Sequence, residues 1–110
     1  MTTRTLQILL ALADGPLHGY GIKQKVEERT HGEVRLGSGT LYEAVHRLLA
    51  AGDIAEVDAP PDEPVSGGPP RRWYVLTGQG REALSRELRR MEEVLRYARG
   101  RDLLGDGVMP

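Results

Sequence analysis

Short polar side chains and glycines stand together at the start of a helical segment that spans residues 36–52. Ser38, Thr40 and Tyr42 carry hydroxyl groups that can donate hydrogen bonds, and Gly39 leaves room for a close approach of the backbone. The unpaired amides at the start of such a helix attract an anion. This combination suits the phosphates and base edges of nucleic acid. In the alternative interpretation, Thr40 only caps the helix and Tyr42 only packs against the preceding helix.

Basic side chains that could neutralise phosphates occur in three segments of the chain. They are Lys23, Lys25, Arg47, Arg71 and Arg72. Each true phosphate contact releases counterions and steepens the dependence of affinity on salt. Charged residues at such positions are equally typical of a solvated face, so the sequence leaves each of them as a candidate. Glu43 would be repelled by phosphate; it points outward, pairs with Arg47 or accepts from a cytosine amino group.

The remaining reactive side chains do not form the pattern of an active site or a metal centre. His18, His31 and His46 lie far apart and lack the spacing of a zinc-binding helix, and the chain has no cysteine. Asp62 and Glu63 lie in a proline-rich segment that could not hold a general acid rigidly. No glycine-rich loop follows a strand in the manner of a nucleotide site. We therefore expect no enzyme activity, no metal and no cofactor.

Helical periodicity defines the elements that must position the polar and basic side chains. Apolar residues recur at helical spacing over residues 3–13, 19–30, 36–52 and 77–99, which predicts four helices. In the second of these, Tyr20, Ile22 and Val26 are expected to face inward. Thr77 is the expected N-cap of the last helix.

The third helix has one apolar face and one polar face. Val45 and Leu48 belong to its apolar stripe, which should pack on the core. Ser38 or Thr40 is the expected N-cap, and Gly52 stands where a left-handed residue ends a helix. The opposite face, which holds the hydroxyl side chains, is left free to contact a partner.

The periodicity changes after the third helix. Ile54 and Val57 are strand candidates, as are residues 72–76, where apolar and polar side chains alternate. Between them, residues 58–70 hold five of the seven prolines, three acids and no basic residue. This segment predicts the tip of a β-hairpin. The fold class is therefore mainly α with a small β-hairpin, in the order of a winged helix-turn-helix followed by a long C-terminal helix.

The last helix carries a heptad-like apolar seam that its own domain has no evident groove to cover. The seam and the apolar stripe of the first helix would both be buried against a second copy of the chain. The residues expected at this interface are Leu84, Leu88, Met91 and Leu95 from the last helix and Leu6, Leu9 and Leu10 from the first. In the alternative, the seam folds back onto its own domain.

Composition limits the function classes further. The formal net charge is −1 and the isoelectric point is about 6.3, which argues against a general nucleic-acid coat protein. Sequence-specific binding remains compatible with this charge, because local patches steer association. The longest early apolar run, residues 8–13, is far too short for a membrane span or a signal sequence. A cytoplasmic protein is expected.

Three sequence blocks, in this order and spacing, resemble the PadR family of bacterial transcriptional regulators. The blocks are His18-Gly19-Tyr20-Gly21-Ile22, then Gly39-Thr40-Leu41-Tyr42 with Arg47-Leu48, and then Arg71-Arg72-Trp73-Tyr74-Val75-Leu76-Thr77 with Gly80. The resemblance covers roughly residues 6–95 and is closest to members with a single terminal helix. Two departures stand out: Gly37-Ser38 replaces the family's common Ser-Pro, and the hairpin tip is acidic.

The resemblance implies a winged-helix repressor that dimerises through its first and last helices and binds double-stranded DNA at a palindromic promoter operator. In many members a small molecule releases the DNA, and some members hold aromatic compounds between the dimer helices; Met91 or Tyr97 would line such a space. The implied organisation is a DNA-binding domain over residues 1–77, a dimerisation helix over 78–101 and a flexible tail over 102–110.

A rival interpretation keeps the fold and changes the function. The acidic balance, the acidic hairpin tip and the unusual Gly37-Ser38 are compatible with a winged-helix interaction module that no longer binds specific DNA. Nine of the fifteen basic residues lie from Arg71 onward, mostly on the last helix. The two functions differ in whether positive charge gathers on one face around residues 38–47 and 71–72.

Overall fold

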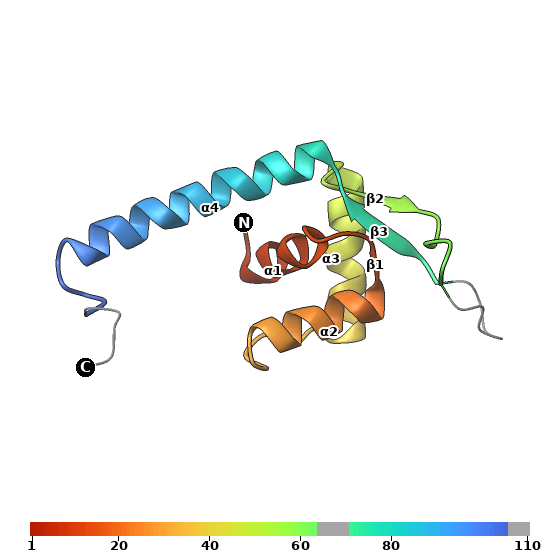
Figure 1. Cartoon of the computed structure of the whole chain (residues 1–110), viewed down its shortest axis with the longest axis horizontal. Coiled ribbons are helices and arrows are strands. Elements are labelled where there is room, and N and C mark those ends of the chain that lie inside the picture. The colour runs from red at the N-terminus through yellow and green to blue at the C-terminus, as the bar shows by residue number, and fades with distance from the viewer. Residues whose placement is uncertain (64–70, 106–110) are drawn as a thin grey trace.

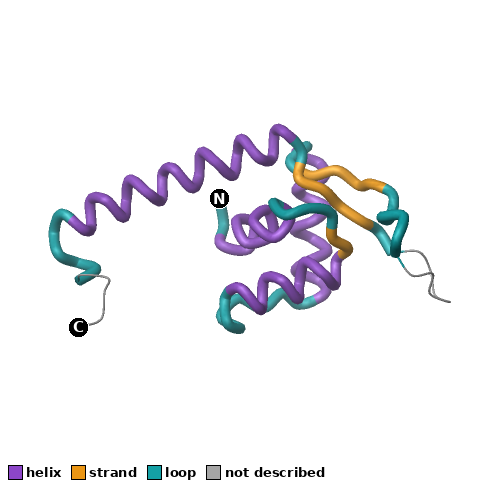
Figure 2. The backbone as a smooth tube through the Cα atoms, in the orientation of Figure 1, coloured by secondary structure: helices purple, strands orange, loops and turns teal. Residues whose placement is uncertain are grey.

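The computed structural model describes residues 1–63 and 71–105 of the chain. Three helices and a small antiparallel sheet form the body of the molecule, a fourth helix extends away from it, and the chain is mainly α-helical (Figures 1 and 2). In chain order the elements are α1 (Thr3–Leu12), β1 (Leu17–His18), α2 (Gly19–Arg29), α3 (Ser38–Ala51), β2 (Ile54–Val57), β3 (Trp73–Leu76) and α4 (Gly78–Arg99). The fold class predicted from the sequence is confirmed, and the hairpin tip lies partly outside the described residues.

The sheet has three strands where the sequence predicted two. Its order is β1-β3-β2, with both pairings antiparallel and Leu17 opposite Tyr74. A two-residue strand has no periodicity to detect, which is why β1 was missed. The extra strand makes β3 central, so Trp73 and Tyr74, on opposite faces, are both buried.

The ends of the helices follow the sequence prediction in two cases and depart from it in one. Gly52 closes α3 with φ of 83°, and the Thr77 hydroxyl caps α4 by accepting from the Gly80 amide at 3.0 Å. The predicted cap of α3 is wrong, because Gly37 occupies the N-cap position and no side chain caps the helix. Ser38 and Thr40 already lie inside the first turn.

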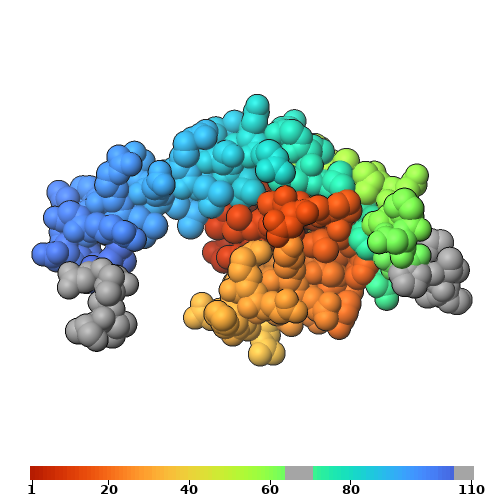
Figure 3. Space-filling view, in the orientation of Figure 1, coloured from red at the N-terminus to blue at the C-terminus, as the bar shows by residue number. Residues whose placement is uncertain are grey.

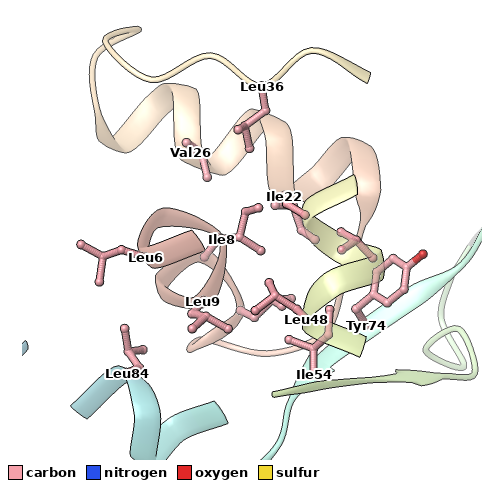
Figure 4. Close-up of a cluster of buried hydrophobic side chains, with 14 residues drawn as sticks. Leu6, Ile8, Leu9, Ile22, Val26, Leu36, Leu48, Ile54, Tyr74 and Leu84 are labelled. Carbon is pink, nitrogen blue, oxygen red and sulfur yellow. The ribbon is translucent and has the colours of Figure 1, made fainter. Parts of the chain in front are cut away.

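The core is centred on α1, which packs against α2, β3 and α4 (Figure 4). Ile8 and Leu9 are fully buried and Leu6 is 9% exposed. The interpretation of Leu6 and Leu9 as dimerisation residues is therefore corrected: both side chains are already covered by their own subunit. From α2, Ile22 and Val26 enter the same core, as predicted.

Helix α4 leaves the body of the molecule soon after it begins (Figure 3). Leu84, 5% exposed, is its last buried apolar side chain, and it points toward Leu6 of α1 (Figure 4). Leu84 therefore belongs to the subunit core, which corrects its assignment to the interface between copies. Beyond it, the exposed fractions rise to 38% for Leu88 and 42% for Met91. The second half of the apolar seam is thus uncovered within one subunit.

No helix among the described residues is long and apolar enough to cross a membrane.

Candidate nucleic-acid interface

A hollow of about 440 Å³ opens where α2, α3 and β3 meet. Its floor is apolar because the buried stripe of α3 reaches it through Leu41, Val45 and Leu49. The side chains around it are polar or aromatic. The residues that line it are Gly19, Tyr20, Lys23, Ser38, Leu41, Tyr42, Val45, His46, Leu49, Arg72 and Tyr74.

The charges around this hollow have one sign. Lys23 and Arg72 contribute a cation each, and no carboxylate lines the hollow among the residues that the structure describes. The nearest acidic partner is Glu56, whose carboxylate lies 4.0 Å from the Arg72 guanidinium with both side chains largely exposed. An exposed pair at that distance contributes little, so the guanidinium remains available to a phosphate.

Aromatic side chains project from both helices beside these cations. Tyr42 is 64% exposed and its ring lies 4.4 Å from that of His46 one turn on. Tyr20, at the start of α2, is 59% exposed. Exposed tyrosines next to cations can donate hydrogen bonds to phosphates while their rings cover sugar or base.

His18 connects the start of α2 to the β2–β3 hairpin. Its Nδ1 accepts a hydrogen bond from the Gly21 amide at 3.0 Å, which caps α2, and its ring meets the edge of Trp73 at 4.8 Å. Accepting at Nδ1 leaves the proton of the neutral ring on Nε2. The Arg71 guanidinium, 2.8 Å from Nε2, is then a close neighbour rather than a donor to the ring. In this tautomer no atom of His18 accepts a hydrogen bond from Arg71, so the Arg71 guanidinium remains available to bind an anion.

Lowering the pH should reduce the free energy of unfolding through protonation of His18. Burial, followed by the charge of Arg71, lowers the pKa of His18 against an opposing effect of Glu63. The unfolded chain therefore takes up the proton first, so the stabilisation is complete above about pH 6.5 and is lost as the pH falls through the lower folded pKa. We expect His18→Asn, which keeps a capping acceptor, to flatten the fall in unfolding free energy on acidification.

The matched control for this prediction is His31→Asn. His31 is exposed and has a φ of 52°, a conformation that asparagine tolerates. Urea unfolding followed by circular dichroism at several pH values measures the effect. The prediction is contradicted if His18→Asn leaves the dependence of the unfolding free energy on pH unchanged, or if His31→Asn changes it by the same amount.

The structure brings together some of the residues predicted to contact DNA and separates others. Lys23, Ser38, Tyr42 and Arg72 line the same hollow, and Arg71 lies beside it with His18 and Tyr20. Lys25 points elsewhere and forms an ion pair with Asp14 at 2.7 Å. The remaining predicted residues, Gly39, Thr40 and Arg47, belong to α3 outside the lining of the hollow.

Sequence reasoning missed Tyr20 and Tyr74 as part of this surface, and it did not name His46 among the DNA-binding residues although His46 lies on the polar face of α3. Tyr20 was expected to face inward, and its exposure corrects that prediction. A helix turns about 100° per residue, so a side chain two positions before Ile22 cannot share its face. That signal was available in the sequence. Tyr74 could not be found this way, because its strand is covered on both faces.

The sequence family described as "Transcriptional regulator PadR-like family" matches residues 8–86. The chain belongs to the PadR family. Members of this family are transcriptional regulators and not enzymes. The resemblance of the three sequence blocks is thereby confirmed.

Two curated proteins are similar in sequence. The transcriptional regulator Rv3488 of Mycobacterium tuberculosis is 37% identical over 95 residues, covering 86% of this chain and 81% of that protein. An uncharacterized 37.1 kDa protein of transposon TN4556 from Streptomyces fradiae is 42% identical over 84 residues. That match covers 76% of this chain and 21% of the transposon protein, so the chain spans about a fifth of its length.

Solved PadR structures share the fold. A PadR-like transcription factor from Bacteroides fragilis superposes with a TM-score of 0.73 at 26% identity, over 88% of this chain and 87% of that one. PadR of Bacillus subtilis in complex with operator DNA gives a TM-score of 0.65 at 22% identity. This second match covers 79% of the present chain and 47% of the B. subtilis chain.

Proposed function

We propose that this PadR-family regulator is a repressor that binds a palindromic promoter operator as a homodimer in the cytoplasm. The observation that carries the proposal is the hollow between α2, α3 and β3, where Lys23 and Arg72 stand beside exposed tyrosines and no carboxylate from residues 1–63 or 71–105 lines the wall. The relative from B. subtilis, which was solved with operator DNA, supports it.

In this proposal the first turn of α3 enters the major groove. Ser38 and Gly39 are exposed at its start, and Tyr42 follows on the side of the hollow. No side chain caps α3, so the amides of its first turn are free to bind a phosphate. Thr40 and Arg47 extend the same surface toward the other flank of the helix. Lys23, Arg71 and Arg72 then neutralise the flanking phosphates.

The second half of α4 supplies the contact between two subunits. Leu88, Met91, Val94 and Leu95 are 38–64% exposed although all are apolar. Exposed apolar seams at this spacing are typical of helix pairs. Together with the half-buried Leu10 of α1, they would bury against a twofold mate and separate two α3 helices by about 34 Å, one turn of DNA.

In this proposal a small aromatic effector releases the DNA by binding between the two subunits. Met91 and Tyr97 are 42% and 61% exposed on α4 and would border the space between two subunits. One face of the Tyr97 ring is covered by the Arg101 guanidinium at 3.6 Å, a cation–π contact that a ligand would have to share or displace. Titration of the operator complex with aromatic acids and cationic dyes tests this arm.

Removing one phosphate-binding cation should change the salt dependence of DNA binding by a known amount. We expect Lys23→Gln and Arg72→Gln each to reduce the slope of log affinity against log salt by about 1.8, because the homodimer loses one contact in each subunit and each contact contributes about 0.9. Lys25→Gln is the matched control, because Lys25 lies on the same helix but pairs with Asp14. Fluorescence anisotropy over a salt series measures the slopes. Equal slopes for all three variants and the parent would contradict a contact at the hollow.

The proposal as a whole is tested with DNA from upstream of the protein's own gene. Tight binding to this fragment, with two subunits per site and far weaker binding to a scrambled duplex, is the expected result. Equal and weak binding to both duplexes and to other promoter fragments, vanishing near physiological salt, would favour the rival function, an interaction module that acts through protein contacts.

A further inference from the structure

The end of α3 and the start of α4 are joined through the side chain of Thr77. Its hydroxyl donates to the carbonyl oxygen of Gly52 at 2.7 Å and accepts from the Gly80 amide at 3.0 Å. Its own amide donates to the carbonyl oxygen of Asp53 at 3.1 Å. One residue thus provides hydrogen-bond partners for a carbonyl at the end of α3 and for an amide at the start of α4.

Gln79 adds a second link from the first turn of α4. Its amide nitrogen donates to the carbonyl oxygen of Ala51 at 2.6 Å and to the carboxylate of Asp53 at 3.0 Å. Ala51 is the last residue of α3, and its carbonyl has no partner further along its own helix. The Gln79 side chain is exposed, so these bonds shape the contact between helices without filling the core.

The backbones also approach closely at this point. A Cβ atom on Gly80 would lie 1.9 Å from the carbonyl oxygen of Asp53, a distance that only glycine allows. We call this contact the α3–α4 joint, formed by Ala51, Gly52 and Asp53 on one side and Thr77, Gln79 and Gly80 on the other. Beyond the joint, Leu84 is the last α4 residue whose side chain is buried against the body of the subunit.

Small rotations at the joint have large consequences at the far end of α4. The helix has 22 residues. At 1.5 Å per residue it is about 33 Å long, so a rotation of about 10° moves its end by roughly 6 Å. One base-pair step of DNA is about 3.4 Å. A dimer held together by the far half of α4 therefore keeps a fixed distance between its two α3 helices only if the joint is rigid.

We propose that Thr77 and Gln79 are positioning residues that set which spacing of operator half-sites the dimer accepts. The inference rests on the proposed function, since it needs a dimer and an operator. Neither residue reads DNA in this scheme; they hold the reading helix at a fixed angle to the dimerisation helix. Loosening the joint should leave the affinity for one half-site unchanged and reduce the discrimination between spacings.

The first experiment measures affinity for operators whose half-sites are moved apart or together by single base pairs. The parent protein should lose affinity at least about fivefold for a shifted spacing, the lower end of ordinary coupling effects. Gln79→Ala should lose clearly less affinity than the parent at a shifted spacing, while its affinity for an isolated half-site is unchanged. Glu82→Gln, an exposed change in the same stretch of α4, should behave like the parent. A parent-like spacing profile in Gln79→Ala would overturn the proposal.

Thr77 is tested by a pair of variants, because it also caps α4. Thr77→Ser keeps the hydroxyl and should retain the spacing profile, whereas Thr77→Val removes it and should broaden the profile. Circular dichroism shows whether Thr77→Val is folded at the assay temperature. If the serine variant broadened the profile as much as the valine variant, the hydroxyl would not be the cause.

A second measurement needs no DNA and separates failure of the joint from failure of the proposed function. Because the chain has no cysteine, spin labels can be attached at Ala50→Cys on α3 and Arg89→Cys on α4. Pulsed electron paramagnetic resonance on labelled chains diluted with unlabelled ones gives the distance distribution within a subunit. Gln79→Ala should broaden it. An unchanged width would overturn the proposal even if DNA binding were established, and a broadened width without any DNA binding would locate the failure in the proposed function.

Discussion

Replacing Gly80 by alanine is expected to lower the free energy of unfolding by about 3 kcal/mol, the upper end of ordinary overpacking costs. The new Cβ would lie 1.9 Å from the carbonyl oxygen of Asp53, 2.8 Å from its carbonyl carbon and 2.9 Å from Leu76 Cδ1. The first two atoms belong to the backbone at the end of α3, which cannot move without breaking the Thr77 hydrogen bonds. Urea unfolding followed by circular dichroism measures the loss.

Gly78→Ala is the matched control for this prediction. Gly78 lies in the same first turn of α4, and a Cβ atom there would meet no heavy atom within 4 Å. Alanine restricts the unfolded chain more than glycine does, so this variant should gain up to about 1 kcal/mol. Both variants are compared at one protein concentration, because a dimer's stability depends on it. Equal stabilities of the two variants would refute the close contact at Gly80.

The amphipathic parts of the fold followed from the sequence because one side of each element is solvated. Ile22 and Val26 are buried at helical spacing in α2, as Val45 and Leu48 are in α3. Gly52 ended α3 as predicted, since few other residues adopt its positive φ without strain. In these elements, local chemistry and the global fold agree.

The errors in α1 have a different origin. The helical spacing predicted one apolar stripe containing Leu6 and Leu9, which was expected to face a second subunit. In the structure Ile8, Ala11 and Leu12 are buried as well, so α1 is covered on nearly all sides. Residues 8–13 form an unbroken apolar run, which is typical of a buried segment, and this signal was present in the sequence.

The candidate DNA surface could be predicted only in part, because it is assembled from three separate elements. Lys23 and Lys25 are two positions apart on α2 and look equivalent in the sequence. Only tertiary structure shows that Lys23 lines the hollow while Lys25 meets Asp14 from the preceding turn. The same holds for Arg72, which reaches the hollow because β3 pairs with β1 next to α2. Side chains that converge from distant segments show no regular spacing in the sequence, so sequence patterns cannot identify them as one site.

Introducing a charge into the exposed part of the α4 seam is expected to separate the dimer. Leu88 is 38% exposed within one subunit, so Leu88→Glu should leave the subunit folded. In a dimer the same side chain would be buried against the partner, where an unpaired carboxylate is strongly unfavourable. We expect a monomer in solution and a loss of operator affinity of at least about 100-fold, because two linked reading helices become independent. Size-exclusion chromatography with light scattering gives the mass, and anisotropy gives the affinity.

The control for the seam is Arg86→Glu, one turn before Arg90 on the polar side of α4, where the side chain is exposed. This variant changes the net charge more than Leu88→Glu does, so a general effect of charge would weaken the dimer of Arg86→Glu more. A local effect of the seam predicts the opposite order: Arg86→Glu remains dimeric and Leu88→Glu does not. If Leu88→Glu kept the mass of a dimer, α4 would not be the dimerisation helix, and the angle fixed at the α3–α4 joint would have no bearing on operator spacing.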